Sequence, residues 1–212
     1  MDILCTDKTG TITEGVVAVH GAEDWNGAPS DRALLLAYLN AAFESGFPNP
    51  IDEALRKLTP PGADRYSKVD EVPYDFTRRR LSVAVTDGSQ RLLVTKGALA
   101  SVLEVCDRAE DAAGRSAPLT EVRAAIEARF EALSRDGYRC LGVASRELDG
   151  DGPIGRDDER GLAFVGILSL ADPIKPHAGD TLRELAELGI RVAIVTGDVP
   201  VPTSITWTRR RW

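Results

Sequence analysis

The residues best suited to chemistry stand near the start of the chain, in the run Asp7-Lys8-Thr9-Gly10-Thr11. An aspartate at the end of a strand can act as a nucleophile and form an aspartyl phosphate. The same carboxylate can bind Mg²⁺, which prefers oxygen donors. Lys8 adds positive charge near an incoming phosphate, and Gly10 allows the backbone to approach it closely. The run therefore predicts phosphoryl-transfer chemistry rather than a simple turn.

A second acidic turn that contains glycine, Thr196-Gly197-Asp198, follows an apolar segment near the other end of the chain. Asp7 likewise follows a short apolar run over residues 3–5. In open α/β sheets, sites lie at the carboxyl ends of strands. Both turns stand where such a site is expected, and almost everything between them would be an insertion that contains antiparallel strands.

Hydrophobic periodicity gives the elements that must position these turns. Helices are expected over 32–45, 51–58, 97–106, 119–135 and 176–188. Strands are expected over 3–5, 138–148, 162–170 and 190–195, and a strand signal also runs from 66 to 96, within which 81–86 and 91–95 are individual strands. Asp87-Gly88 predicts a hairpin turn between two of these strands, and the charged segment 149–161 predicts a loop.

The composition is that of an ordinary globular chain of one or two small domains. Of 212 residues, 43% are hydrophobic and 28% are charged. The net charge of -7 argues against a nucleic-acid binder, because phosphate backbones are held mainly by Lys and Arg. No apolar run approaches the roughly 20 residues of a membrane helix. Cys5, Cys106 and Cys140 have no metal-binding or redox spacing and indicate a reducing compartment.

The run Asp7-Lys-Thr-Gly-Thr-Ile-Thr resembles the phosphorylation signature of the P-type ATPases, which belong to the haloacid dehalogenase superfamily. Further matches follow in the family's order over residues 1–198. The resemblance implies that Asp7, Lys8 and Thr9 are catalytic and that Asp7 and Thr9 also hold Mg²⁺. The nucleotide-binding residues that it implies are Asp52, Phe76, Lys96, Gly97, Arg139, Asp172, Thr196, Gly197 and Asp198.

The resemblance also implies individual roles around the nucleotide. Phe76 is similar to the aromatic on which adenine stacks, and Asp52 to an acidic residue near the adenine amino group. Lys96-Gly97-Ala98 resembles the family's nucleotide-site Lys-Gly-Ala, and Arg139 resembles an arginine that reaches the ATP phosphates.

Two further matches concern the frame of the site and the subfamily. Asp172, in Asp-Pro-Ile-Lys-Pro, resembles the hinge motif between the two cytoplasmic domains, and 196–198 resembles the second phosphate-binding turn. The amino-acid sequences of segments 48–55, 72–83 and 166–176 are most similar to those of bacterial magnesium-transporting P-type ATPases. The family implies ATP and Mg²⁺ as cofactors and a place on the cytoplasmic side of a membrane pump.

Taken singly, the matched residues have ordinary interpretations. Phe76 could be plain core, Lys96 a surface lysine, and the run Arg78–Arg80 a solvated face. Arg139 could pair with Glu147 or with another surface acid. The order and spacing of these residues favour the nucleotide site.

The implied fold is α/β. It has an incomplete, Rossmann-like phosphorylation domain of the haloacid dehalogenase type over 1–13 and 161–198. An α+β nucleotide-binding domain, an antiparallel sheet flanked by helices, is inserted over 14–160, and 199–212 resembles nothing in the family. The family's later phosphate-binding Lys and Mg²⁺-binding carboxylates have no match after Asp198. We therefore expect this chain alone to be inactive, and its incomplete sheet to self-associate weakly through an exposed edge.

The function favoured by the sequence is the ATP-binding cytoplasmic portion of a P-type cation-transporting ATPase. One alternative is a catalytically inactive nucleotide-binding or interaction module. A small soluble phosphatase is disfavoured by Thr9. Phosphatases of this superfamily carry an Asp-x-Asp motif whose second Asp is the general acid and base, and Thr9 stands at that second position. A Thr hydroxyl does not readily take a proton at pH 7, so a phosphate on Asp7 would persist.

Overall fold

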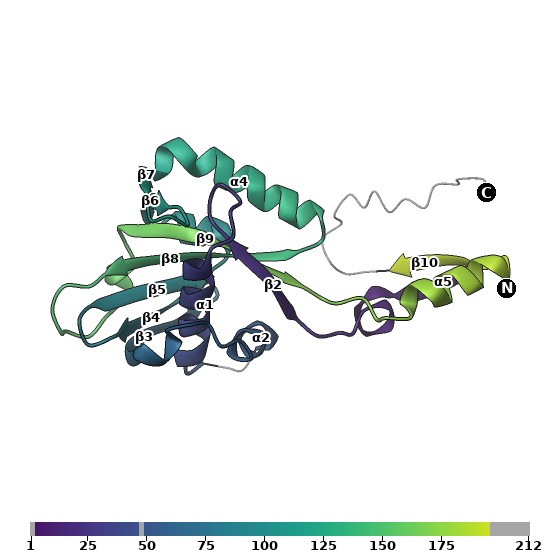
Figure 1. Ribbon diagram of the computed structural model, residues 1–212, viewed down its shortest axis with the longest axis horizontal. Coiled ribbons are helices and arrows are strands. Elements are labelled where there is room, and N and C mark those ends of the chain that lie inside the picture. Colours follow the sequence, from purple (N-terminus) through teal and green to yellow (C-terminus); the bar gives the residue numbers. More distant parts are fainter. Residues whose placement is uncertain (1–2, 47–48, 196–212) are drawn as a thin grey trace.

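The computed structural model describes residues 3–46 and 49–195, which form two units joined by two crossings of the chain (Figure 1). The large unit runs from β2 to β9, and the small unit combines β1 with α5 and β10. The predicted turn 196–198 and the tail 199–212 lie outside the described residues.

The large unit is built on one eight-stranded sheet with the strand order β3-β4-β5-β8-β9-β6-β7, and β2 also pairs with β9. Neighbours are antiparallel except for β6 and β9, which are parallel. Its strands are β2 (Ala18–Glu23), β3 (Ser67–Asp75), β4 (Arg80–Thr86), β5 (Arg91–Gly97), β6 (Cys106–Glu110), β7 (Ser116–Pro118), β8 (Arg139–Glu147) and β9 (Leu162–Ala171).

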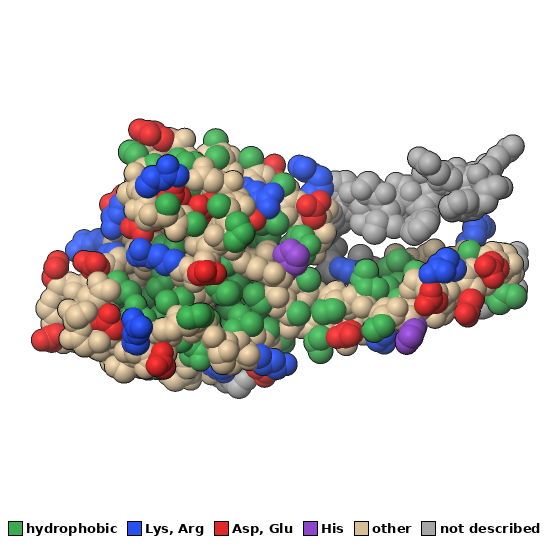
Figure 2. Space-filling view, in the orientation of Figure 1, with side chains coloured by type: hydrophobic (Ala, Val, Ile, Leu, Met, Phe, Trp, Pro, Cys, Tyr) green, Lys and Arg blue, Asp and Glu red, His purple; other side chains and the backbone are tan. Residues whose placement is uncertain are grey.

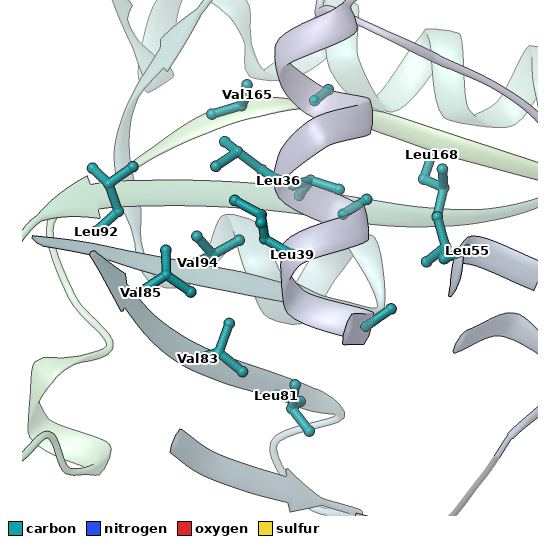
Figure 3. Packing of buried hydrophobic residues seen from close by; sticks show 14 of the residues in the cluster. Leu36, Leu39, Leu55, Leu81, Val83, Val85, Leu92, Val94, Val165 and Leu168 are labelled. Carbon is teal, nitrogen blue, oxygen red and sulfur yellow. The ribbon is translucent and has the colours of Figure 1, made fainter. Parts of the chain in front are cut away.

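Helices cover both faces of this sheet, so the large unit has a hydrophobic layer on each side. On one face, α1 (Asp31–Phe43) packs on β4, β5, β8 and β9, and α2 (Pro50–Arg56) packs against α1 and β2. Figure 3 shows Leu39 of α1 beside Val94 and Leu55 of α2 near Leu168. On the other face lie α3 (Leu99–Leu103) and α4 (Leu119–Arg135), around the fully buried Phe164. Two short turns of helix, Ala63–Arg65 and Arg156–Asp158, lie in the connections.

Local signals explain where α1 begins and how it is held. The Ser30 hydroxyl accepts a hydrogen bond from the Ala33 amide at 3.1 Å and so caps the helix. Asn40, fully buried in the last turn of α1, donates to the Leu81 and Val94 carbonyls at 3.1 and 2.9 Å. These hydrogen bonds tie the end of the helix to β4 and β5.

The strand β9 corrects the expected division of the chain. Residues 161–198 were expected to belong with Asp7, but β9 lies inside the large sheet, between β8 on one side and β6 and β2 on the other. All its residues except Ala171 are buried. An apolar run of this kind predicts a strand covered on both faces, but it does not say which sheet contains that strand. The large unit therefore ends after Ala171 and not at residue 160.

Most other elements agree with the sequence expectation. The helix over 119–135 and the hairpin at Asp87 are confirmed, and the helix expected to reach Cys106 ends earlier, at Leu103. The strands β2, β6 and β7 were not predicted. They are short, and β6 carries charged residues where an alternating strand would have apolar ones.

The small unit, as far as the structure describes it, is a two-stranded parallel sheet with one helix. In it, β1 (Ile3–Asp7) pairs with β10 (Arg191–Val195), from Ile3 opposite Arg191 to Asp7 opposite Val195. The helix α5 (Ala178–Glu187) contacts β10, and none of its residues is buried. No helix within the described ranges is both long enough and apolar enough to cross a membrane.

Figure 2 shows Lys and Arg side chains interspersed with Asp and Glu over the visible face of both units. This mixed pattern is consistent with the net charge of -7 and with a surface that has no bias toward polyanions.

Candidate functional site

Strand register brings several of the predicted residues to one end of the large sheet. Gly97 at the end of β5 pairs with Arg80 at the start of β4 on one side and with Gly142 of β8 on the other. Phe76 lies in the turn just before β4, and Arg139 begins β8. This sheet end therefore carries Phe76, Lys96, Gly97 and Arg139.

Phe76 is not a core residue, because 89% of it is exposed. The Asp75 carboxylate accepts hydrogen bonds from the amides of Thr77 and Arg78 at 2.7 and 3.2 Å, which closes the turn. The ring of Tyr74 meets Phe76 edge-on at a centroid distance of 5.4 Å. A large aromatic that is presented to solvent on a closed turn suits a flat ligand that stacks on it.

Lys96 is not a surface lysine: only 6% of it is exposed, and its ammonium forms an ion pair with the equally buried Asp52. Asp52 lies in the first turn of α2, where the Asn49 side chain caps its amide at 2.9 Å. Burial lowers the pKa of Lys96, and the charge of Asp52 opposes that shift. The two residues, which the resemblance assigned to one site, are thus in direct contact.

Two residues that the sequence reasoning missed complete this group. Glu44 follows α1 and lies 3.3 Å from the Arg56 guanidinium of α2. Burial and the negative charge of Asp52 raise the pKa of Glu44 above its usual value. Nothing in the spacing of these residues indicated the cluster, because Glu44 comes from the end of one helix and Arg56 from the end of the next.

Position 97 requires glycine because the backbone of Arg79 and Arg80 packs closely against it. A β-carbon at this position would lie 2.4 Å from the Arg79 carbonyl oxygen and 2.7 Å from the Arg80 α-carbon. Arg79 itself has a positive φ of 49°, and its carbonyl accepts a hydrogen bond from the Ala98 amide at 2.9 Å. Gly97 therefore lets the turn that carries Phe76 pack directly on β5.

Arg139 is exposed at the first position of β8, opposite Leu170 of β9. Alternation along the strand places it on the face that carries Leu141 and Val143, which is also the face of Lys96. Glu147 is at the other end of the nine-residue strand. The alternative that Arg139 pairs with Glu147 is therefore wrong.

The Asp7 turn lies in the small unit, at the carboxyl end of β1 as the sequence predicted. Asp7 is exposed, and one of its carboxylate oxygens accepts the Lys8 amide at 2.8 Å. The turn Lys8–Ile12 closes through the Thr13 amide on the Lys8 carbonyl at 3.1 Å, and Gly10 has a φ of 79°. The carboxylate and the neighbouring carbonyls are hard oxygen donors that suit Mg²⁺. Among the described residues, no group of three or more metal-binding side chains gathers.

Asp172 lies in the link between the units. Its carboxylate accepts the Thr13 hydroxyl at 2.6 Å and the Gly15 amide at 3.0 Å. Lys175 donates to the Gly10 carbonyl at 2.6 Å, so the second crossing also holds the Asp7 turn. Both Asp172 oxygens are therefore engaged by donors of the protein, and the hinge role stays a prediction.

The predicted residues form two separate groups. Figure 1 shows the Asp7 turn in the small unit, apart from the sheet end of the large unit that carries Phe76 and Lys96. The remaining predicted residues, Thr196, Gly197 and Asp198, lie outside the described residues. The assignments of catalytic, metal-binding and nucleotide-binding roles stay predictions.

Comparison with known proteins points to one family. A family model described as P-type ATPase, cytoplasmic domain N, matches residues 2–177. The magnesium-transporting ATPase, P-type 1, of Salmonella typhimurium is 38% identical over 215 residues, which cover 96% of this chain and 24% of that protein. The Escherichia coli protein of the same name is 37% identical, over 93% of this chain and 23% of its own length.

A more distant relative is the plasma membrane ATPase of Kluyveromyces lactis, which is 28% identical over 93% of this chain and 21% of its own length. The chain thus spans less than a quarter of the length of these relatives.

Proposed function

The chain belongs to the P-type ATPase family and carries its cytoplasmic domain N, and from this premise we propose that it binds ATP at the sheet end formed by Phe76, Lys96 and Arg139. The observation that carries the proposal is the 89% exposure of Phe76 at the sheet end that also carries the buried Lys96–Asp52 ion pair. An exposed aromatic ring and paired charges at one sheet end supply a stacking platform and polar groups for a single ligand.

Each residue of this sheet end has a part in the proposed binding mode. In this binding mode adenine stacks on Phe76, and its amino group is directed toward the carboxylate of Asp52. Lys96 is held by Asp52, so the two act as one polar unit that fixes the orientation of the base. Arg139, exposed on the same face of the sheet, meets the phosphates.

We further propose that Asp7 accepts a phosphoryl group when the large unit brings ATP to the small unit. A carboxylate oxygen of Asp7 forms a bond to the γ-phosphorus, the bond from that phosphorus to the bridging oxygen breaks, and ADP leaves. Lys8 and the backbone of the turn orient the phosphate. Mg²⁺, held by Asp7 and the Thr9 carbonyl, supplies charge neutralisation when bound. Asp172 would keep the link aligned, and residues 196–198 would complete the phosphate site.

For the whole protein we propose cation transport driven by ATP, with Mg²⁺ as the cargo. The support is that the relatives in Salmonella and Escherichia are magnesium-transporting ATPases. The alternative, a nucleotide-binding module that does not phosphorylate itself, is favoured by the separation of Asp7 from the Phe76 sheet end. Label on Asp7 in a phosphorylation assay on the present chain would exclude this alternative.

Binding is tested by titrating the chain with ATP in an NMR or calorimetric experiment. We expect weak binding, about 1 mM, and a loss of about 5- to 150-fold in Phe76→Ala, because base stacking contributes about 1–3 kcal/mol. Val69→Ala, which removes another exposed apolar side chain from β3, is the matched control and leaves the affinity unchanged. Equal affinities in the wild type and Phe76→Ala would refute stacking on Phe76.

Phosphorylation is tested with radiolabelled ATP and Mg²⁺, followed by an acid quench. A hydroxylamine-sensitive label that disappears in Asp7→Asn would identify Asp7 as the acceptor. Absence of label is the result expected of the present chain for both functions, so only the appearance of label decides between them.

A further inference from the structure

A buried charge cluster lies beneath the Phe76 turn, on the face of β4 opposite to Lys96. Leu81 and Val83 of β4 face the α1 layer, so Arg80 and Ser82 point to the other side of the sheet. There the carboxylate of Glu159 accepts a hydrogen bond from Arg80 at 2.8 Å and another from the Ser82 hydroxyl at 2.7 Å. Arg78 donates to the same carboxylate.

Glu159 is the centre of this cluster. Its side chain is fully buried, with an exposure of 0%, and those of Arg78 and Arg80 are 13% and 11% exposed. The expectation that Arg78–Arg80 forms a solvated face is therefore wrong for Arg78 and Arg80. Their partner is about 80 residues away along the chain, in the segment 149–161, which the sequence marked only as a charged loop.

Arg78 and Arg80 hold the turn 75–80 in place. Arg78 also donates to the Pro73 carbonyl at 2.7 Å, and Arg80 to the Ser101 carbonyl at 3.0 Å. Arg78 thus ties the strand that enters the turn to Glu159, and Arg80 ties the strand that leaves it. The turn that they hold includes the exposed Phe76 and the strained Arg79.

We propose that Glu159 is a positioning residue for the nucleotide site, which holds the turn 75–80 through Arg78 and Arg80 so that the Phe76 ring stands ready for the base. This inference rests on the proposed ATP binding. A carboxylate suits this place, because it accepts from two guanidinium groups and a hydroxyl at once, and no neutral side chain does so. The ring of Phe76 is 89% exposed and meets Tyr74 only edge-on, so its direction depends on the backbone below it.

The test replaces Glu159 by glutamine, which keeps the shape but turns one acceptor into a donor that faces Arg or Ser82. The ¹H–¹⁵N heteronuclear NOE of the amides of residues 76–79 is measured in the ligand-free chain, and affinities for ATP and adenosine are measured by NMR titration. We expect the NOE of this turn to fall. Both affinities should weaken by the same factor, about tenfold, since the stacking of the base is affected and the phosphate contacts are not.

Two matched controls separate positioning from general loss of stability. Glu104→Gln removes an exposed acid that lies 3.8 Å from the same Arg80, and Glu23→Gln removes half of a bidentate pair with Arg129 away from the turn. Both should leave the turn NOE and the affinities unchanged. If Glu159→Gln does not fold, Ser82→Ala removes one hydrogen bond to the Glu159 carboxylate. The turn NOE should again fall, and the affinities for ATP and adenosine should weaken about threefold.

The outcomes are distinguishable. A folded Glu159→Gln with an unchanged turn NOE and unchanged affinities overturns the inference. If the wild type binds neither ATP nor adenosine, the proposed function fails, and the ligand-free NOE then decides alone whether Glu159 fixes the turn. Equal effects in Glu23→Gln and Glu159→Gln would also overturn the inference, because they would reduce it to stability.

Discussion

The large and small units present functional residues on very different foundations. Phe76 and Lys96 stand at the end of an eight-stranded sheet with a hydrophobic layer on each face. Within the described ranges, Asp7 stands on a two-stranded sheet whose helix buries no residue, and whose turn 8–12 buries none either. Independent stability usually needs three or more strands or a covered apolar face. The proposed nucleotide site is thus supported by the hydrophobic core of its own unit. The position of the Asp7 turn depends mainly on hydrogen bonds to the link.

The first prediction tests this contrast by removing one apolar side chain from each unit. Phe164→Ala should lower the free energy of unfolding of the large unit by about 3–5 kcal/mol, because it leaves a cavity in a closed core. Leu185→Ala, which truncates a half-buried side chain of α5 in the small unit, should lower the free energy of unfolding of the chain by about 0.5 kcal/mol or less.

Urea denaturation, followed by circular dichroism, measures both variants. Similar losses for Phe164→Ala and Leu185→Ala would contradict the contrast, since they would mean that the small unit and the large unit share one cooperative core.

The second prediction sharpens the comparison at the sheet end itself. Gly97→Ala should cost about 1–3 kcal/mol and displace the Phe76 turn, because the new methyl group would overlap the Arg79 carbonyl. Gly21→Ala in β2 is the matched control, since a β-carbon added there would have no atom within 4 Å and its φ is not positive. Thermal unfolding with amide chemical shifts of residues 75–80 measures the result, and a normal turn in a stable Gly97→Ala protein would contradict it.

The third prediction uses thiols as reporters of the two units. Burial raises the pKa of Cys106 in the large unit from 9.0 to about 12. Above pH 9 the unfolded chain therefore loses a proton that the folded chain keeps. The stability contributed by this thiol is complete below pH 9 and falls as the pH rises toward 12, by at most about 1.4 kcal/mol per pH unit.

Urea denaturation between about pH 8 and pH 10.5 should show this slope in the wild type and a smaller one in Cys106→Ala. In the folded protein, iodoacetamide should modify the exposed Cys5 of the small unit before Cys106. Faster modification of Cys106 than of Cys5 would show that the large unit opens more readily than its packing indicates.

The sequence predicted those parts of the molecule that rest on local pattern. Asp7 does end a strand, and the helix over 119–135 has its expected bounds. Periodicity could not decide that β9 belongs to the large sheet, because a fully apolar run has no face that points to a particular partner.

Contacts between distant segments were the other limit. The contact of Lys96 with Asp52 joins residues 44 positions apart, and Glu159 meets Arg80 across 79 positions. The family resemblance assigned Lys96 and Asp52 to one site but did not predict that they are in contact. Nothing assigned the second pair, since a buried acid in a charged loop looks the same in sequence as a solvated one.

The link between the units has a mechanical consequence. A single connection would let one unit swivel about the other in any direction. Here two crossings run side by side, with Thr13 paired to Ile174, Glu14 bonded to the Pro173 carbonyl and Asp172 bonded to Thr13. Such a double tether suppresses twisting and leaves bending about a line through both crossings as the soft motion. Because Lys175 on the second crossing holds the Gly10 carbonyl, each such bend pulls directly on the turn that carries Asp7.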